Sequence, residues 1–336
     1  MEPIIRERFN EAILAAARER YGIAADQIHL LDGFESFMFE FVKDGGAFIL
    51  RLGHGRRRTP DLVHGEVDWI NYLADGGAGV ARAVLSPNGE LVELIPDGQG
   101  DYFLATAFVK AQGRPVWQTE QWNETFWRTY GRLLGRMHHL SKSYQPARSA
   151  WQRPPWDAPT NLIAHETLLH EDGLMSRHYL DVLAHLQALP RTPDAYGLIH
   201  QDAHTGNMFV DENGRITLFD FDDCVYGHFA YDLAMVLFYA VANHADPDAF
   251  AAVFWPAFWQ GYQMENQLDP VWLREIAPFM KLREIELYTI LMRDYGPENL
   301  EHDSWATRYL NGRLQRIEHN VPVVDEAAFL TNEGNL

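Results

Sequence analysis

The sequence predicts an α+β protein with two lobes: a small N-terminal lobe built on an antiparallel β-sheet and a larger, mainly helical C-terminal lobe. Two observations predict this division of the 336 residues. Short β-rich runs separated by Gly and Pro turns occupy the first 109 residues. After a polar break at 110–115, apolar residues recur at helical spacing, and nine of the ten Trp residues lie in this part. We therefore assign 1–109 to the first lobe and 110–336 to the second.

Local patterns predict the elements of the first lobe. An amphipathic helix is expected over 9–21, where the apolar residues share one side. Runs rich in aromatic and β-branched residues predict strands, and a Gly-containing turn at 43–46 joins two of them. A second helix is expected over 61–74 because apolar residues again recur at helical spacing. The predicted strands are 28–31, 37–42, 47–52, 84–85, 91–95 and 102–109.

Helices dominate the second lobe. Asp246 is expected to cap one of them, with Pro247 at the first helical position, because both residue types favour helix starts. The tail, 324–336, is expected to be loosely held. The predicted helices are 120–140, 165–189, 230–242, 246–263 and 270–295.

A predicted hairpin lies in the most informative stretch of the chain. The β-rich runs 208–210 and 216–219 flank Asn213-Gly214, which is a strong hairpin signal. A hairpin brings the residues that enter it beside those that leave it. Residues 202–207 and 220–222 are therefore expected to share one rim.

The oxygen-bearing side chains of this rim suit phosphoryl transfer from ATP. Asp202 is followed five residues later by Asn207, and Asp220 comes thirteen residues after that. Phosphoryl transfer needs a carboxylate to accept a hydroxyl proton and oxygen ligands to hold Mg²⁺ against the phosphates. Single Asp and Asn residues at strand ends usually serve turns, but the whole spaced set favours a functional site.

The pattern His-x-Asp-x-x-x-x-Asn, followed by a hydrophobic residue, Asp and Phe, resembles the aminoglycoside phosphotransferase and choline kinase family, which has a protein-kinase-like fold. The resemblance implies that Asp202 is the catalytic base and that Asn207 and Asp220 are Mg²⁺ ligands. It supports Asp222 less directly, as an additional or outer ligand. It also makes Asp232 a buried polar anchor in the helix that follows.

The resemblance identifies the cation that contacts phosphate. A protein-kinase-like fold carries a Lys on its third strand for the α- and β-phosphates. This chain has Arg51 on that strand and no Lys, so Arg51 takes the role, and its planar guanidinium suits phosphate. Arg51 should form an ion pair with an acidic residue on the helix 61–74. We prefer Glu66 to Asp68 because it lies centrally.

The resemblance also implies the other nucleotide contacts of the first lobe. Gly33 begins a flap over the phosphates, with Ser36 and backbone amides as donors. The backbone near Ala107, Phe108 and Val109 forms the hinge that hydrogen-bonds adenine. ATP and Mg²⁺ are the implied cofactors.

Other polar residues near these segments are expected to be structural. His200 and His204 should orient the catalytic loop rather than take part in the chemistry. The basic run 53–58 connects a strand to a helix, and we favour a solvated loop over a contact with phosphate or substrate.

Composition excludes some classes of partner. A formal net charge of −19 argues against a nucleic-acid substrate, because a phosphate backbone needs a basic surface. The charge fits a cationic substrate such as an amine, although solubility is the simpler explanation. No apolar run reaches the roughly 18 to 20 residues of a membrane span. Cys224 is the only cysteine, so no intrachain disulfide forms, the thiol is expected in the core, and a cytoplasmic location is expected.

The sequence thus predicts an ATP-dependent kinase that moves the γ-phosphate of ATP to a hydroxyl of a small molecule. An amino sugar, an amino alcohol and a homoserine-like metabolite all fit as acceptors. One alternative is a protein Ser/Thr kinase, disfavoured because no peptide-docking or activation segment stands out between Asp222 and Asp232. The other is a non-catalytic nucleotide-binding module, disfavoured because Asp202, Asn207 and Asp220 are all present. The preference between ATP and GTP, the oligomeric state and direct metal binding by Asp222 stay open at this point.

Overall fold

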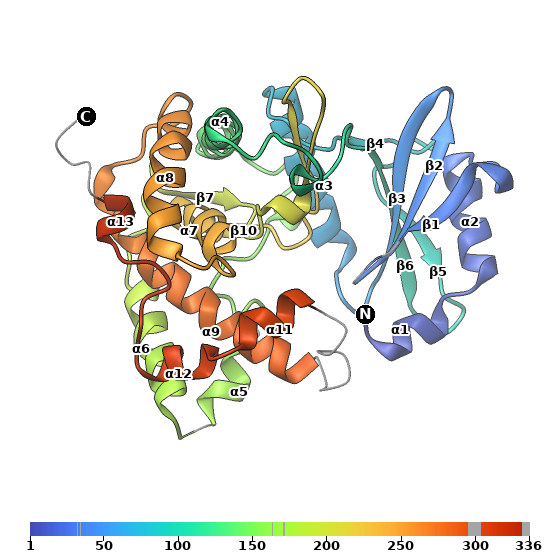
Figure 1. The fold of residues 1–336 in the computed structure, drawn as a ribbon. Helices are drawn as coiled ribbons and strands as arrows, with labels where there is room; N and C mark the ends of the chain where they lie inside the picture. Colours follow the sequence, from blue (N-terminus) through green and yellow to red (C-terminus); the bar gives the residue numbers. More distant parts are fainter. Residues whose placement is uncertain (32, 34, 163, 171, 295–303, 331–336) are drawn as a thin grey trace.

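The computed structural model describes residues 1–31, 33, 35–162, 164–170, 172–294 and 304–330. Figure 1 shows the two lobes of the predicted α+β fold, with the sheet in one lobe and most helices in the other. Cys224 is buried, as expected for a core residue. Within the described ranges, none of the helices combines the length and the apolar character that crossing a membrane requires.

An antiparallel sheet of six strands forms the smaller lobe. The strand order is β1-β2-β3-β6-β4, and β5 also pairs with β6. The predicted turn at 43–46 joins β2 and β3, because Lys43 and Gly46 are the last paired residues of that hairpin. The strands are β1 (Ile28–Leu31), β2 (Phe37–Lys43), β3 (Gly46–His54), β4 (Ala83–Val84), β5 (Glu93–Pro96) and β6 (Tyr102–Val109).

The two faces of this sheet have different partners. One face packs against α1 (Pro3–Arg8) and α2 (Glu11–Tyr21), and Leu50 and Ala107 lie in that core. The sequence predicted α2 but not α1. Side chains alternate along a strand, so Arg51, the neighbour of Leu50, belongs to the opposite face, which borders a cavity.

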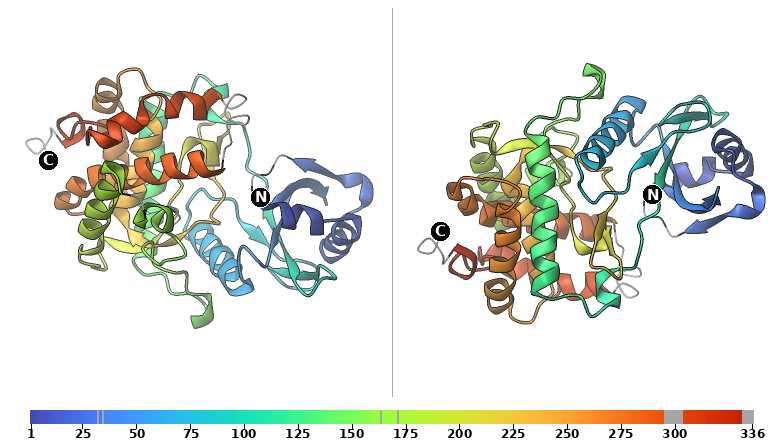
Figure 2. Two further views of the ribbon diagram at one scale, coloured as in Figure 1. Left: turned by 90° about the horizontal axis from the view of Figure 1, so that it is seen from below. Right: turned by 90° about the horizontal axis from the view of Figure 1, so that it is seen from above.

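Helix α3 (Pro60–Asp75) connects the two lobes. Its buried residues, among them Val67, Trp69 and Leu73, belong to the same hydrophobic core as the helical lobe. Both views of Figure 2 show α3 between the sheet and the helical lobe. Glu66 is therefore carried by a helix that is fixed to the larger lobe. The division of the chain at residues 109 and 110 stays a prediction.

Most predicted helices of the larger lobe are present with small shifts in their ends. Asp246 accepts a hydrogen bond from Ala249 N at 3.0 Å and caps α8 (Pro247–Gln263), with Pro247 at the first position as predicted. The single helix expected over 165–189 is instead two helices, and Gly173 caps the second. The helix expected over 270–295 begins as a 3₁₀ turn, and residue 295 lies outside the described residues. The helices are α4 (Glu124–Ser141), α5 (His165–Leu169), α6 (Leu174–Gln187), α7 (Phe229–Val241), α8 (Pro247–Gln263), α9 (Ile276–Asp294), α11 (Ser304–Leu310), α12 (Arg313–Glu318) and α13 (Ala327–Leu330).

The larger lobe also contains two small strand pairs. β7 (Tyr196–Ile199) pairs with β10 (Val225–His228), and β8 (Met208–Val210) pairs with β9 (Ile216–Leu218). The second pair is the predicted hairpin, with Gly214 in its turn at a φ of 76°. Positive φ costs glycine little, which is why Asn-Gly predicts this turn.

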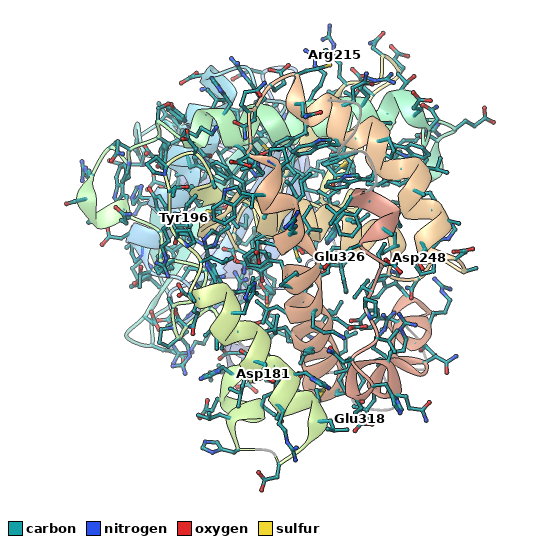
Figure 3. The ribbon with its side chains drawn as sticks, turned by 90° about the vertical axis from the view of Figure 1, so that its left-hand side faces the viewer. Asp181, Tyr196, Arg215, Asp248, Glu318 and Glu326 are labelled. Carbon is teal, nitrogen blue, oxygen red and sulfur yellow. The ribbon has the colours of Figure 1, made fainter. Side chains whose placement is uncertain are left out.

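The end of the described chain returns to α8. Asp325 N donates to Oδ1 of Asp248 at 2.8 Å, and the rings of Phe329 and Trp255 meet edge to face. Figure 3 shows Asp248 beside Glu326 at this place. Residues 324–330 of the tail are therefore held on the helical lobe, contrary to expectation, because apolar residues such as Val324 are buried there. Residues 331–336 lie outside the described residues.

Candidate functional site

A cavity of about 710 Å³ lies between the sheet and the helical lobe. Part of its wall is apolar, with Met38, Ile49 and Phe108 from the sheet and Ile70 from α3. All predicted site residues except Asn207 and Ala107 line it. The sheet lobe and α3 contribute Gly33, Ser36, Arg51, Glu66 and Val109, and the helical lobe contributes Asp202, Asp220 and Asp222.

Asp232 fixes the backbone at the start of the predicted catalytic loop. It is fully buried in α7, and its carboxylate accepts hydrogen bonds from His200 N at 2.9 Å and Gln201 N at 2.6 Å. Gln201 has a φ of 70°, in the left-handed region of the backbone that residues other than Gly rarely adopt. The two hydrogen bonds hold this strained residue in place. His138 of α4 contacts the same carboxylate at 3.1 Å, so Asp232 is the buried anchor that the sequence indicated.

Asp202 has a polar partner at each carboxylate oxygen. Its Oδ2 lies 3.1 Å from Nδ2 of Asn207 and 3.3 Å from Nε2 of His204. Its Oδ1 accepts a hydrogen bond from Nη2 of Arg283 at 3.1 Å. Burial alone would raise the pKa of Asp202, but His204 and Arg283 hold it well below its usual range. The carboxylate is therefore ionised at neutral pH and able to accept a hydrogen bond from a hydroxyl.

The two histidines of the loop make orienting contacts, as expected. His200 Nδ1 accepts a hydrogen bond from Asp202 N at 3.2 Å, and its Nε2 donates to Phe219 O at 3.1 Å. Burial lowers the pKa of His200, so the ring is neutral and can do both. His204 Nδ1 accepts from Gly206 N at 2.8 Å, which leaves its Nε2–H for Asp202.

Arg283 was not predicted from the sequence. It lies on α9, 81 residues beyond Asp202, and its Nε also donates to the hydroxyl of Tyr239 at 3.2 Å. No short motif surrounds it, and it is one of many arginines in the chain. Only the packing of α9 against α7 brings it to the catalytic loop.

Asn207 and Asp220 occupy the two sides of the hairpin rim. Asn207 Nδ2 donates to the backbone oxygen of Asp202 at 2.9 Å, and its own backbone oxygen accepts from Phe219 N at 2.9 Å. Asp220 has a φ of 65° and lines the cavity. Within the described part of the chain no group donates a hydrogen bond to its carboxylate. Desolvation within the cavity and the neighbouring Asp222 raise the pKa of Asp220 to about 7, with Arg51 partly opposing them.

The environment of Asp220 fits a divalent cation. Asp220 is open to the cavity, and its carboxylate is repelled by that of Asp222, so a positive charge at this place would be stabilising. Carboxylate and amide oxygens are ligands that Mg²⁺ accepts, and the hairpin holds Asp220 close to Asn207, whose Nδ2 is already used on Asp202. The Oδ1 atom of Asn207 is the one that remains for a cation.

Arg51 and Glu66 form a buried, two-pronged ion pair. Nη1 and Nη2 of Arg51 donate to Oε1 and Oε2 of Glu66 at 2.8 and 2.7 Å. Burial alone would lower the pKa of Arg51, but Glu66 raises it, so the guanidinium stays charged. Asp68, the less favoured partner, instead accepts a hydrogen bond from the hydroxyl of Tyr144 at 2.7 Å.

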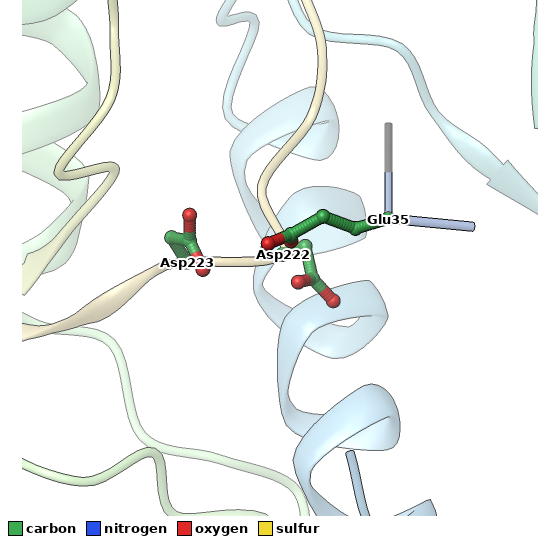
Figure 4. Close-up of side chains that lie close together, drawn as sticks. All are labelled: Glu35, Asp222 and Asp223. Atoms are coloured by element: carbon green, nitrogen blue, oxygen red, sulfur yellow. The ribbon is translucent and has the colours of Figure 1, made fainter. Parts of the chain in front are cut away.

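The basic loop after β3 is not solvated in the way the sequence suggested. Arg57 forms ion pairs with Glu35 and Asp222, and Arg58 lies 2.6 Å from Asp223. Figure 4 shows the side chains of Glu35, Asp222 and Asp223 gathered at this place. Burial would raise the pKa of Asp222, but Arg57 and Arg58 hold it well below its usual range. The Asp222 carboxylate is therefore neutralised by arginines of the other lobe.

The residues predicted to form the flap and the hinge border the cavity, with the exception of Ala107. A Cβ atom on Gly33 would lie 2.2 Å from Ser36 O, so only glycine fits the turn before β2. Ala107 is fully buried on the α2 face and pairs with Leu50 and Val84, which keeps it away from the cavity. The hinge residues that line the cavity begin at Phe108.

Comparison with known proteins places this geometry in a family. Residues 27–275 match the model of APH, the phosphotransferase enzyme family. Amicoumacin kinase of Bacillus subtilis (strain 168) is 36% identical over 317 residues, which cover 93% of each protein. The fold is similar to that of an amicoumacin kinase in complex with AMP-PNP, Ca²⁺ and Ami, with a TM-score of 0.89 and 32% identity over 97% of this chain and 99% of that one. A microcompartment-associated aminopropanol kinase has a TM-score of 0.75 and 20% identity over 96% of this chain and 99% of that one.

Proposed function

Since this chain belongs to the phosphotransferase enzyme family (APH), we propose that the cavity between its lobes is where a phosphoryl group passes from ATP to a hydroxyl. The chain is an ATP-dependent kinase of small molecules, and ATP with a divalent metal ion are its cofactors. This activity is favoured over a protein Ser/Thr kinase and over a non-catalytic nucleotide-binding module. The observation that carries the site assignment is the convergence of Asp202, Asp220 and the Arg51–Glu66 pair on one cavity.

Asp202 acts as the base in this proposal. Its ionised carboxylate orients the acceptor hydroxyl and takes its proton as the oxygen attacks the γ-phosphorus. The bond from that phosphorus to the β-phosphate oxygen breaks, and ADP leaves. Arg283 and His204 keep the carboxylate charged and fixed in direction. The protein contributes mainly by positioning the reactants and stabilising charge, because phosphoryl transfer depends chiefly on these two effects.

Asn207 and Asp220 are the proposed ligands of the divalent cation. A cation held there would offset the negative charge of the phosphates. Asp222 supports the site from outside, since its carboxylate is occupied by Arg57 and Arg58.

Arg51 supplies a fixed positive charge for the phosphates, and Glu66 holds its guanidinium in place from α3. The flap that begins at Gly33 and includes Ser36 covers the phosphates. Both flap residues lie on the cavity wall with Arg51.

The hinge backbone is the proposed contact for adenine. Val109 N donates to Arg82 O at 2.8 Å and Lys110 N donates to Ala47 O at 3.1 Å, so these two amides are used within the sheet. Among the described residues, none accepts the amide hydrogen of Ala111, which lines the cavity. Val109 O and Ala111 N therefore form the donor–acceptor pair, while Ala107 supports the hinge from within the sheet.

We propose an acceptor that carries an amine near its hydroxyl. Glu286 is buried on α9 behind the cavity wall, one helical turn from Arg283, which binds Asp202, and no described residue donates a hydrogen bond to Glu286. A buried carboxylate without a donor suits a cationic ligand. The net charge of −19 would attract such a ligand. The relative at 36% identity is named amicoumacin kinase, so amicoumacin is the first acceptor to test.

An ATP-consumption assay with separate acceptors tests this proposal. Amicoumacin, aminopropanol, choline, homoserine and a neutral sugar are each supplied with ATP and Mg²⁺, and phosphorylated product is identified by mass spectrometry. Turnover is expected with an amine-bearing acceptor and not with the sugar. Asp202→Ala should abolish product but keep ATP binding. Wild-type turnover in Asp202→Ala would overturn the site, whereas turnover with the sugar alone would overturn only the acceptor class.

A further inference from the structure

Hydrogen bonds to His54 shape the loop between β3 and α3 and set the direction of its arginine side chains. Arg57 N and Arg58 N both donate to His54 O, at 2.9 and 3.3 Å, and Arg56 N donates to Nδ1 of His54 at 3.2 Å. His54 itself is buried. The Arg56 side chain is 47% exposed, whereas that of Arg57 is only 18% exposed. The backbone therefore turns Arg57 inwards and leaves Arg56 in solvent.

Arg57 connects the flap to the segment that carries Asp220. One of its terminal nitrogens, Nη2, contacts Glu35 in the flap, and the other, Nη1, contacts Asp222. Figure 4 shows the Glu35 side chain reaching towards Asp222. All three side chains line the same cavity as Arg51. A single guanidinium thus connects elements of both lobes at the charged end of the cavity.

Two other cations on the cavity wall, Arg51 and Lys110, are already paired with carboxylates, which leaves a phosphate-binding role for Arg57. ATP carries several negative charges, and both terminal nitrogens of Arg51 are already bound to Glu66. Lys110, another cation on the wall, is paired with Glu40 at 2.5 Å near the hinge. Glu35, by contrast, is 45% exposed, and an ion pair with an exposed carboxylate contributes little. Arg57 can therefore exchange Glu35 for a phosphate at small cost.

We propose that Arg57 is a phosphate-binding residue of this kinase. When ATP binds, the Arg57 guanidinium leaves Glu35 for the β- or γ-phosphate and stays beside Asp222. Arg58 also contacts Asp222, at 3.3 Å, so the buried carboxylate keeps a partner during the exchange. Glu35 then acts as a competitor that holds Arg57 ready before the nucleotide arrives. This inference rests on the proposed assignment of the cavity to ATP.

The carboxylates around Arg57 allow a different assignment, which the test also addresses. Oxygens of Glu35, Asp222 and Asp223 lie within 4.8 Å of one another. Arg57 and Arg58 already neutralise these groups, so we assign the nucleotide contact to Arg57 rather than a metal ion to the carboxylates. If Glu35 held a metal ion, its removal would weaken nucleotide binding. If Glu35 competes with phosphate for Arg57, removal of the Glu35 carboxylate should strengthen nucleotide binding.

Calorimetric titration of the full chain with AMP-PNP and with AMP, both with Mg²⁺, separates these outcomes. Arg57→Gln should weaken AMP-PNP binding about 10- to 100-fold, the range of one charged hydrogen bond, and change AMP binding less than about 2-fold. Arg56→Gln, from the same turn, is the control and should change neither. Glu35→Gln should bind AMP-PNP a few fold more tightly. Because Glu35 is exposed, this variant tests the inference even if Arg57→Gln fails to fold.

Several results would overturn the inference. Equal loss of AMP-PNP and AMP binding in Arg57→Gln would show a structural role. Unchanged AMP-PNP binding in that variant, or weaker binding in Glu35→Gln, would also exclude the proposed exchange. If neither nucleotide bound the wild-type chain, the assignment of the cavity to ATP would fail instead. The wild-type titration therefore distinguishes failure of the proposed function from failure of the role of Arg57.

Discussion

Arg283 of α9 donates from Nη2 to Oδ1 of Asp202 at 3.1 Å, and so connects a late helix of the chain to the proposed catalytic base. The same guanidinium donates from Nε to the hydroxyl of Tyr239 at 3.2 Å, which fixes its plane. Asn207 and His204 occupy the other oxygen of Asp202. The direction of the base is therefore set by contacts on both of its oxygens.

We expect Arg283→Gln to lower kcat about 10- to 100-fold, because one charged hydrogen bond to the base is lost. The Kd for AMP-PNP should stay within about 2-fold, since Arg283 is not on the cavity wall. Steady-state kinetics with the identified acceptor and a nucleotide titration measure the two quantities. Tyr239→Phe, which removes only the second contact, should have a smaller effect on kcat. An unchanged kcat in Arg283→Gln would mean that the contact does not orient the base.

The parts of the fold that the sequence predicted depend on neighbours in the chain. Asn213-Gly214 predicts its hairpin because glycine tolerates the φ of 76° that the turn requires. Asp246 predicts a helix start because its side chain binds an amide three residues ahead. Asp202 and Asp220 could be assigned to one rim because a single hairpin separates them. Local geometry decides each of these features.

The features that the sequence did not reveal depend on packing between distant elements. Arg283 lies 81 residues from Asp202, and Arg57 lies 165 residues from Asp222. No local pattern distinguishes these arginines from Arg56, which is solvated. Ala107 was placed at the hinge by resemblance, but the register of β6 with its neighbours keeps it inside the sheet. Such contacts follow only from the completed fold.

The carboxylate of Asp220, to which no described residue donates a hydrogen bond, predicts a strong coupling between metal and nucleotide. In wild-type protein, AMP-PNP with Mg²⁺ should raise the Tm more than AMP-PNP with EDTA does. Asp220→Asn should remove that difference and weaken binding of the magnesium complex at least about 10-fold, because one charged ligand is lost. Glu212→Gln, in the exposed turn of the same hairpin, is the matched control. A full metal-dependent shift of the Tm in Asp220→Asn would exclude Asp220 as a ligand.

The Arg51–Glu66 pair allows stability and function to be separated. Arg51→Met leaves the fully buried Glu66 without a partner, so we expect a loss of about 3–5 kcal/mol in the free energy of unfolding. The double variant Arg51→Met/Glu66→Leu removes both charges and should recover most of that loss. ATP binding should stay weak in both variants, since neither has the cation. Denaturant unfolding and calorimetry measure the two effects. Recovery of ATP affinity in the double variant would contradict the phosphate role of Arg51.

Glu286 is the group whose charge should respond to pH near neutrality. Burial raises its pKa from an ordinary 4.5 to about 7, and Arg283 of α9 partly opposes the shift. Tyr231 of α7 and Tyr179 of α6 also face this carboxylate. A raised pKa in the folded state means that the neutral form is favoured by folding. The contribution of Glu286 to stability is then complete below about pH 4.5 and is lost as the pH rises through about 7.

Glu286→Gln should therefore match wild type in unfolding free energy near pH 5 and exceed it by about 1–3 kcal/mol near pH 8, where only the wild-type group is charged. Chemical denaturation at both pH values measures this difference. The same variant should lose affinity for an amine-bearing acceptor while it keeps its affinity for AMP-PNP, because the ionised Glu286 is the proposed partner of the amine. Equal stability of the two proteins at pH 8 would mean that the carboxylate is already compensated in the free protein. Glu286 would then have no uncompensated negative charge for the amine of an acceptor.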